Sequence, residues 1–222
     1  MADRENKSIV KGMQHLILCE GKDAQFFMIH YLNSKALADN KQYSEAVQVE
    51  DFGGNEQLGS ALKLWSKDPE FLNLKSLVVL RDAETDAQSA VDSIRSAFRK
   101  ADLPVPACPH QFETDGSLKT GFLLFPECSS NLKNGALEDL CLSILEESEV
   151  SGISEIDGFL SDLEKREIRT FPRRFKTRLH TYFSITDDFV SLKIGEAAKA
   201  GAFDWNSSKL DQMKSFLEEM IK

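Results

Sequence analysis

The chain has 222 residues, of which 41% are hydrophobic and 28% charged, and its formal net charge is -9. This composition is ordinary for a soluble globular protein, and the length allows one sizeable α/β core. The surplus of carboxylates argues against a protein that coats nucleic acid electrostatically, although it leaves room for a local basic face. The same surplus suits a site that recruits divalent cations.

The sequence indicates neither a membrane span nor a targeting segment. No apolar run approaches the roughly 18 residues that a membrane-spanning helix needs, and residues 1–12 are too polar for a signal peptide. We therefore expect a cytoplasmic protein without a membrane partner. The cysteines, which have no CxxC spacing, are expected to be reduced structural thiols rather than a disulfide or zinc site: Cys19, Cys108, Cys128 and Cys141.

Strand-like and helix-like segments alternate over the first half of the chain. Strands are predicted over residues 15–20, 47–52, 74–80, about 107–113, and 121–125. Helices are predicted over residues 23 to about 37, over 56–65, and after a capping-box spacing of Thr85 with Gln88. This alternation predicts an α/β fold with a largely parallel sheet and helices on both faces.

The second half of the chain has a helical pattern. An apolar stripe predicts one amphipathic helix over residues 137–145, and residues 154–200 are expected to form two or three more. A last helix is predicted to begin at Ser208. We therefore predict an α/β core over residues 1–126 and a helical region over residues 127–222 that packs on it.

Acidic residues follow the predicted strands at the points where the strands end: Glu20, Asp51, Asp82, Glu84 and Asp86. Ligands of parallel α/β sheets bind at the carboxyl ends of the strands, and several buried anions need a neutralising cation. Mg²⁺ takes oxygen ligands of this kind. Glu20, Asp82 and Glu84 are therefore candidate metal or catalytic residues. For Asp86, and for Asp23 after the first strand, helix capping is an equal alternative.

Two short motifs lie at the ends of apolar strands. The first reads LCEGKDAQFF, and the second, VVLRDAETD, ends in Asp-x-Glu. Their order resembles the Toprim domain of primases, topoisomerases and OLD (overcoming lysogenization defect) nucleases. The intervening VEDFGGNEQL is similar to the Gly-Gly turn of OLD-type domains. Two segments of the second half resemble small stand-alone Toprim-like proteins of unknown function, so the likeness covers most of the chain.

The resemblance implies a fold of Toprim type and roles for these residues. Glu20 would match the glutamate that acts as general acid or base, and Asp82 and Glu84 the aspartate pair that holds Mg²⁺ or Mn²⁺. Because Glu84 replaces an aspartate, its extra methylene would shift the metal geometry by about 1 Å. Further candidate ligands are Asp86, Asp23, Asp51, Glu127 and Glu138. A solvated helix residue is an equal explanation for Glu138.

A basic segment, KREIRTFPRRFKTRLH over residues 165–180, contrasts with the acidic chain. It holds seven Lys or Arg residues and one acidic residue, with two phenylalanines between the arginines. Arg173 and Arg174, together with Lys22, are candidate contacts to nucleic-acid phosphates. The alternative is a solvated helix face that offsets neighbouring acids, with both phenylalanines in the core.

These features predict a Mg²⁺- or Mn²⁺-dependent phosphodiesterase of Toprim type that acts on nucleic acid. One alternative is a non-catalytic Toprim-like module that binds nucleotide or nucleic acid, or serves as a regulatory subunit. A weaker one is a small-molecule phosphotransfer enzyme. The sequence has no GxxxxGK[ST] motif, so an ATPase or defence-complex partner would be a separate chain.

Overall fold

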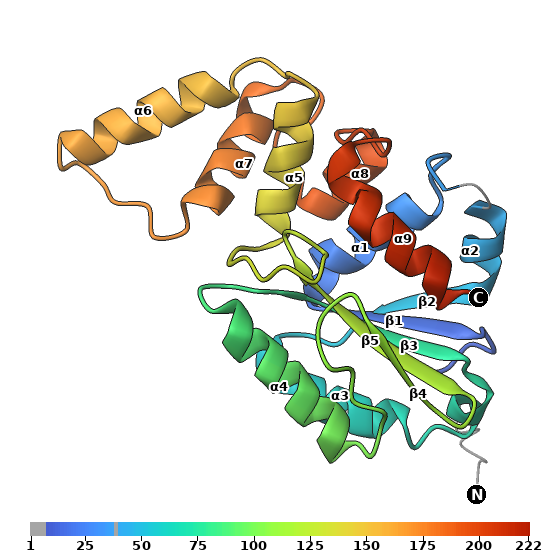
Figure 1. Cartoon of the computed structure of the whole chain (residues 1–222). Helices are drawn as coiled ribbons and strands as arrows, with labels where there is room; N and C mark the ends of the chain where they lie inside the picture. The colour runs from blue at the N-terminus through green and yellow to red at the C-terminus, as the bar shows by residue number, and fades with distance from the viewer. Residues whose placement is uncertain (1–7, 38–39) are drawn as a thin grey trace, which may run out of the picture.

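The computed structural model describes residues 8–37 and 40–222 (Figure 1). Within these residues one sheet contains β1 (His15–Cys19), β2 (Val47–Asp51), β3 (Ser76–Asp82), β4 (Phe112–Asp115) and β5 (Leu118–Phe125), in the order β2-β1-β3-β5-β4. The first four strands of this order run parallel, and β4 is antiparallel to β5. The predicted α/β fold with a largely parallel sheet is confirmed.

The central strands are continuously apolar because helices cover both faces of the sheet. Every residue of β1 and all but the last residue of β3 are buried. Alternate residues enter two separate cores, with Ile17 and Cys19 in one and Leu16 and Leu18 in the other. This alternation also determines the face to which residues just beyond the strands point.

One face of the sheet is covered by the helices α1 (Gly21–Leu32), α2 (Asn40–Ala46), α5 (Leu137–Glu147), α8 (Ile194–Ala200) and α9 (Asp211–Met220). Two more helices belong to the same core, α7 (Arg174–Ile185), which packs on α5, and α6 (Ile153–Lys165), which packs on α7. Apolar side chains of these helices and of the strands form one continuous core. α8 lies beside α1, whereas α6 and α7 extend away from the sheet (Figure 1). The predicted helical region thus packs on the sheet and shares its core.

The opposite face is covered by α3 (Leu58–Trp65) and α4 (Ala87–Lys100). Short 3-10 helices flank these elements at Asn55–Gln57 and Pro69–Asn73, and another, Ser208–Leu210, precedes α9. After β1 the chain therefore passes to one face of the sheet, and after β3 it passes to the opposite face.

Three details differ from the sequence prediction. The N-cap of α4 is Asp86 rather than Thr85, because the Asp86 carboxylate accepts a hydrogen bond from the Ser89 N–H at 3.0 Å. The strand predicted over residues 107–113 begins only at Phe112, since Pro109 has no N–H to donate to a ladder. Helix α2 was not predicted.

The cysteines are free thiols, as predicted. Cys19, Cys128 and Cys141 are buried, and Cys108 is partly exposed. Burial raises the pKa of the three buried thiols far above its ordinary value, which makes them poor nucleophiles. Among the helices of the described ranges, none combines the length and the apolar character that a membrane crossing requires.

The close packing of α1 on α8 depends on Gly195. A Cβ at this position would lie 2.5 Å from the Cβ of Phe26, an atom that cannot rotate away. Gly195→Ala should therefore lower the free energy of unfolding by about 1–3 kcal/mol, measured by urea denaturation. Gly158→Ala on α6 is the matched control, because no atom lies within 4 Å of its added Cβ. The control should stabilise slightly, and equal losses in both variants would contradict the prediction.

Candidate metal site at the sheet edge

The switch point of the sheet lies between β1 and β3. The chain passes from β1 to α1 on one face and from β3 to α4 on the opposite face. Connections that leave in opposite directions open a crevice at the carboxyl ends of the two strands, which is where open α/β sheets bind ligands. Glu20 directly follows β1, and Asp82 ends β3. Both residues therefore flank this crevice.

A pocket of about 150 Å³ lies at this position, and we call it the sheet-edge pocket. Its charged lining residues are Glu20, Lys22, Asp23, Asp82, Glu138 and Lys176. They come from the start of α1, the end of β3, the first turn of α5, and α7. The fold thus brings together acidic and basic side chains from four segments that are distant in the sequence.

Asp82 is a partly buried carboxylate that no ion pair of the described residues neutralises. Its Oδ1 accepts a hydrogen bond from the backbone N–H of Leu137, the first residue of α5, at 2.9 Å. Burial, and then the negative charge of Glu138, raise the pKa of Asp82 to about 7, although the Leu137 N–H acts in the opposite direction. No Lys or Arg of the described chain forms an ion pair with Asp82. Asp82 is therefore an acid that lacks a cation.

Glu20 lies against a buried arginine. The parallel register pairs Cys19 with Leu80, so the next residues along each strand, Glu20 and Arg81, are neighbours. Glu20 Oε2 lies 3.4 Å from Arg81 Nε, and the Arg81 side chain is only 4% exposed. Burial raises the pKa of Glu20, while Arg81 lowers it. Glu20 Oε2 is buried and has no hydrogen-bond partner among the described residues.

Glu138 is buried in the wall of the pocket. It is 7% exposed, so the solvated-residue explanation is wrong. Its Oε1 lies 3.1 Å from the Nζ of Lys176, whose side chain is 37% exposed. Lys176 was not singled out from the sequence, because no local pattern indicates that α7 meets the first turn of α5.

Glu84 and Asp86 do not line the pocket. The backbone of Glu84 is left-handed, with φ of 54°, and exchanges two hydrogen bonds of 2.8 Å with Gly135. Its side chain is exposed, yet its charge is near enough to raise the pKa of Asp82 slightly. Asp86 caps α4. Of the Asp-x-Glu pair, only Asp82 therefore reaches the pocket, and Glu84 lies outside its lining.

Asp23 and Asp51 have structural partners. Asp23 Oδ1 accepts a hydrogen bond from the Gly195 N–H at 3.2 Å, which joins α1 to the first turn of α8. Asp51 Oδ2 pairs with Lys22 Nζ at 2.8 Å, and its Oδ1 accepts from the Gly53 N–H at 2.6 Å. Lys22 thus lies in the lining of the pocket with Asp51 as its counter-ion.

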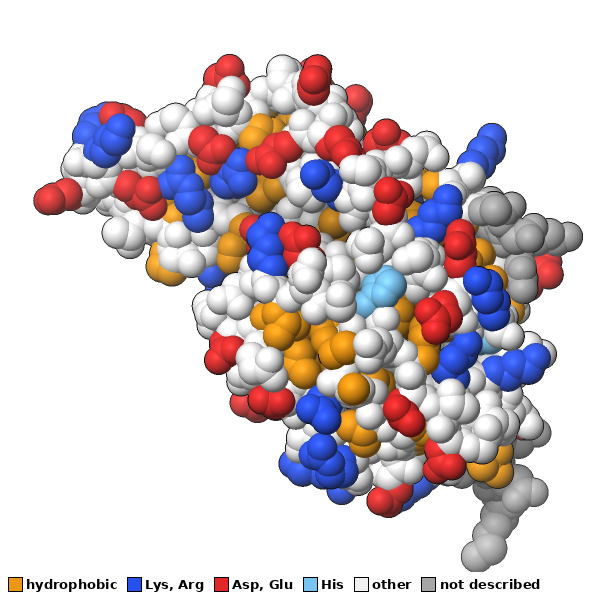
Figure 2. Space-filling model, viewed as in Figure 1, with side chains coloured by type: hydrophobic (Ala, Val, Ile, Leu, Met, Phe, Trp, Pro, Cys, Tyr) orange, Lys and Arg blue, Asp and Glu red, His pale blue; other side chains and the backbone are white. Residues whose placement is uncertain are grey.

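Neighbouring acids neutralise much of the basic segment. Arg174 pairs with Glu164 at 2.6 Å and with Asp157 at 3.7 Å, so its guanidinium is engaged by α6. Further pairs join Arg166 to Asp162, Lys176 to Glu138, and Arg178 to Glu146 and Asp157. Figure 2 shows acidic and basic side chains side by side over α6 and α7. This face therefore carries no continuous basic band.

One further feature of the segment agrees with the alternative of a solvated helix face with its phenylalanines in the core, whereas a second leaves a phosphate contact open. Phe171 and Phe175 are partly buried against the core. Arg173 precedes α7 and is exposed, and it has no ion pair within the described part of the chain. Arg173 thus remains a candidate phosphate contact, whereas the guanidinium of Arg174 is already paired with acidic residues of α6.

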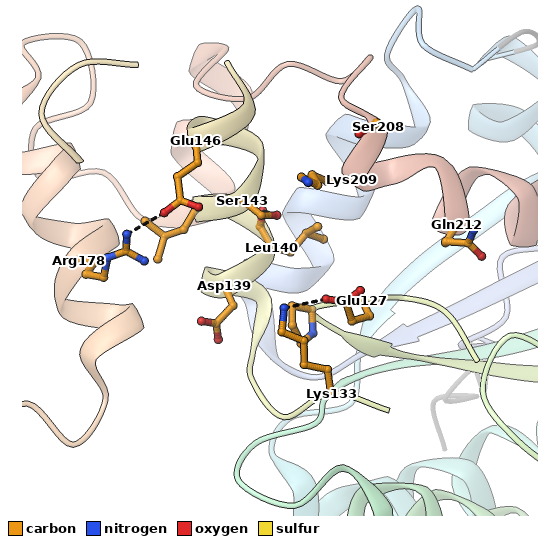
Figure 3. Close-up of a pocket in the computed structure, with 12 residues that line it drawn as sticks. Glu127, Lys133, Asp139, Leu140, Ser143, Glu146, Arg178, Ser208, Lys209 and Gln212 are labelled. Atoms are coloured by element: carbon orange, nitrogen blue, oxygen red, sulfur yellow. Dashed lines mark hydrogen bonds and ion pairs between the residues drawn. The ribbon is translucent and has the colours of Figure 1, made fainter. Parts of the chain in front are cut away.

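A second cavity, of about 410 Å³, lies beside α5 and is bordered by α7 and the start of α9 (Figure 3). Two of its three lining cations, Lys133 and Arg178, are paired within the lining, and the third is Lys209. Lys133 contacts Glu127 at 2.8 Å, and Arg178 contacts Glu146 at 2.7 Å (Figure 3). Glu127 therefore lies in this cavity and not in the sheet-edge pocket.

A family model described as "Protein of unknown function (DUF3226)" matches residues 14–222, which is nearly the whole chain. The chain belongs to the DUF3226 family. No curated protein and no solved structure matches it. Because the family description names no activity, the function of this DUF3226 chain has to be inferred from its site.

The carboxylate oxygens of the sheet-edge pocket are of the chemical type that divalent cations bind. Glu20, Asp82 and Glu138 bring carboxylate oxygens to one pocket, and such oxygens are the ligands that Mg²⁺ and Mn²⁺ take. Over residues 8–37 and 40–222, no three His, Cys, Asp or Glu side chains are already placed around a single metal position. Binding would thus require these side chains to rearrange, including the release of Glu138 by Lys176.

Proposed function

We propose that this DUF3226 chain binds Mg²⁺ or Mn²⁺ in the sheet-edge pocket and catalyses phosphodiester cleavage in nucleic acid. One observation carries the proposal: Glu20, Asp82 and Glu138 meet at the switch point of the sheet, and Asp82 has no cationic partner among the described residues. Carboxylates that are buried together favour the binding of a cation, because the ion removes both their repulsion and the cost of their desolvation.

The residues of the pocket divide into three roles. Asp82 and Glu138 would hold the ion, which takes water for its remaining positions. When bound, a divalent cation stabilises charge on phosphate oxygens and lowers the pKa of a water molecule. Glu20 would accept or donate a proton, a role that suits a carboxyl whose pKa burial raises. Lys22 and Lys176 would contact the phosphate from the lining of the pocket.

The Toprim resemblance supports this assignment through two residues. It relates Glu20 and Asp82, which lie far apart in the sequence, and the two strands that carry them are neighbours in the sheet. The resemblance gives Glu84 a place beside Asp82, whereas Glu138 of α5 lines the pocket. In the proposed site Glu138 therefore takes the ligand position that the sequence motif assigns to Glu84.

A second function, non-catalytic binding of a nucleotide or a nucleic-acid end, is favoured by the ion pairs of the pocket. Arg81 and Lys176 already neutralise Glu20 and Glu138 without a metal. If Lys176 stays with Glu138, neither Glu20 nor Glu138 is left for an ion. The pocket would then bind phosphate through Lys22, with no turnover.

Metal titration and cleavage assays distinguish these functions. Calorimetry with Mn²⁺ should detect binding, and single- and double-stranded DNA and RNA should be cleaved in Mg²⁺ or Mn²⁺ but not in EDTA. Glu127→Gln removes a carboxylate outside the pocket and should change neither result. Metal binding without cleavage of any substrate would favour the non-catalytic function. Absence of metal binding would overturn the proposal.

A further inference from the structure

The second cavity, beside α5, is lined mainly by polar side chains. Nine of its twelve lining residues are polar or charged, so an apolar ligand would not fit it. Its volume of about 410 Å³ lies toward the small end of the range of about 300–1,000 Å³ that is typical of small-molecule sites. The cavity therefore has the size and the polarity of a site for a small hydrophilic molecule.

The lining of this cavity carries equal numbers of acidic and basic side chains. They are Glu127, Asp139, Glu146, Lys133, Arg178 and Lys209. A ligand with one charge would meet like charges in the lining as well as opposite ones. A ligand that carries charges of both signs can place each of them beside its opposite. The balance of charge therefore favours a ligand of the second kind.

Two of these six charges are left without an ion pair. The two pairs within the lining hold four of them (Figure 3). Asp139 and Lys209 are the other two, and neither forms an ion pair within residues 8–37 and 40–222. Asp139 belongs to the first turn of α5, and Lys209 to the 3-10 helix before α9. The cavity thus offers one unpaired negative and one unpaired positive side chain from two different walls.

Both walls also have hydrogen-bonding groups that the described residues do not use. Asp139 Oδ2 accepts a hydrogen bond from the Ala136 N–H at 2.9 Å, whereas its Oδ1 has no such partner. Burial raises the pKa of Asp139, while Lys133 and Arg178 favour its charged form. On the other wall, the side-chain amide of Gln212 is likewise without a partner among the described residues. These groups remain available to a ligand.

We propose that this cavity binds a small zwitterion, a molecule with an ammonium group and a carboxylate, such as a free amino acid or a dipeptide. Asp139 accepts hydrogen bonds from the ammonium group. Lys209 and the Gln212 amide donate hydrogen bonds to the carboxylate. The cavity shares no lining residue with the sheet-edge pocket, so the inference depends neither on a metal ion nor on the proposed function.

Ligand-observed NMR on the full chain in EDTA tests this inference with the common amino acids, γ-aminobutyrate and diglycine as probes. At least one of these zwitterions should bind to wild type. The N-acetylated form of that compound lacks the ammonium charge, and its C-terminal amide lacks the carboxylate. Each of these two forms should bind at least about 10-fold more weakly, which is the loss expected for one charge-assisted hydrogen bond.

Asp139→Asn and Lys209→Gln each remove one of the two unpaired charges and should weaken binding of the zwitterion at least about 10-fold. Asparagine keeps an oxygen for the Ala136 N–H, so the start of α5 is preserved. Lys214→Gln changes a lysine of α9 outside the lining and should leave the affinity unchanged.

Three outcomes overturn the inference. They are the absence of binding by every zwitterion, an unchanged affinity in both folded variants, and equal binding of the forms that lack one charge. If one variant does not fold, the other variant and the two modified compounds still decide. Because the measurement is made in EDTA, none of these outcomes bears on the proposed metal site.

Discussion

Asp82→Asn should abolish Mn²⁺ binding and metal-dependent cleavage while leaving the fold intact. Asparagine keeps an oxygen that can accept the Leu137 N–H, so the start of α5 stays attached to β3. It removes the negative charge that an ion would neutralise. Affinity should fall by more than about 100-fold, which is the upper end of the loss caused by mutating a residue that contacts a metal ligand and not the metal itself. Calorimetry and a cleavage assay measure the two losses, and circular dichroism confirms the fold.

The control variants change carboxylates that lie inside and outside the sheet-edge pocket. Glu138→Gln should weaken metal binding in the same direction, whereas Glu127→Gln in the second cavity should leave it unchanged. Glu20→Gln should also stop cleavage. Because it leaves Arg81 buried without its counter-ion, it is expected to lower stability, and its activity must be compared with its melting temperature. Metal binding and cleavage at wild-type levels by the Asp82→Asn variant would contradict the assignment of Asp82 as a metal ligand.

Asp82 should lower the stability of the metal-free protein as the pH rises from about 4 to about 7, whereas His15, whose pKa burial lowers from 6.5 to about 4, acts in the opposite direction between those two values. The pKa of Asp82 is about 7 in the fold, against an ordinary value of 3.8. Between these values the folded state retains a proton that the unfolded state has released. Stability rises with pH only where the unfolded state binds more protons, so here it falls. The full loss attributable to Asp82, reached above its folded pKa, is about 2–4 kcal/mol.

Denaturation of wild type and Asp82→Asn in EDTA, at pH 5 and pH 8, isolates this contribution. The stability of Asp82→Asn relative to wild type should rise between pH 5 and pH 8, and the variant should be the more stable protein at pH 8. Saturating Mn²⁺ at pH 8 should restore stability to wild type, by about 2.7 kcal/mol at 100 times the Kd, and leave the variant unchanged. Equal pH profiles for the two proteins would show that the Asp82 carboxyl is not destabilised by burial.

Much of the fold could be predicted from local patterns. Consecutive apolar residues predicted β1 and β3, because strands of a parallel sheet are buried on both faces. The same patterns placed Glu20 and Asp82 at strand ends, and the carboxyl ends of parallel strands lie along one edge. Arg81, a charged residue directly after a run of apolar residues, is a further signal in the sequence from which we made no prediction.

The basic segment illustrates what local patterns leave open. Arg174, Lys176 and Arg178 lie close together in the sequence, yet Arg174 and Arg178 contact acids of α5 and α6 while Lys176 reaches the pocket. Residues two apart on a helix point in directions about 200° apart, whereas residues four apart share a face. Helical periodicity separates these residues into two sets. Only the packing of α7 decides which set meets the sheet.

Tertiary packing also decides which residues line the sheet-edge pocket. The order of apolar and charged residues is enough to place acids after two buried strands. Tertiary contacts, by contrast, bring Glu138 to the pocket beside Asp82 and keep Glu84 outside it. Asp82 accepts the first N–H of α5, which carries Glu138 into the pocket, and the left-handed turn at Glu84 is paired with Gly135. Both contacts join segments that no local pattern relates, because they form only when the helical region closes over the sheet edge.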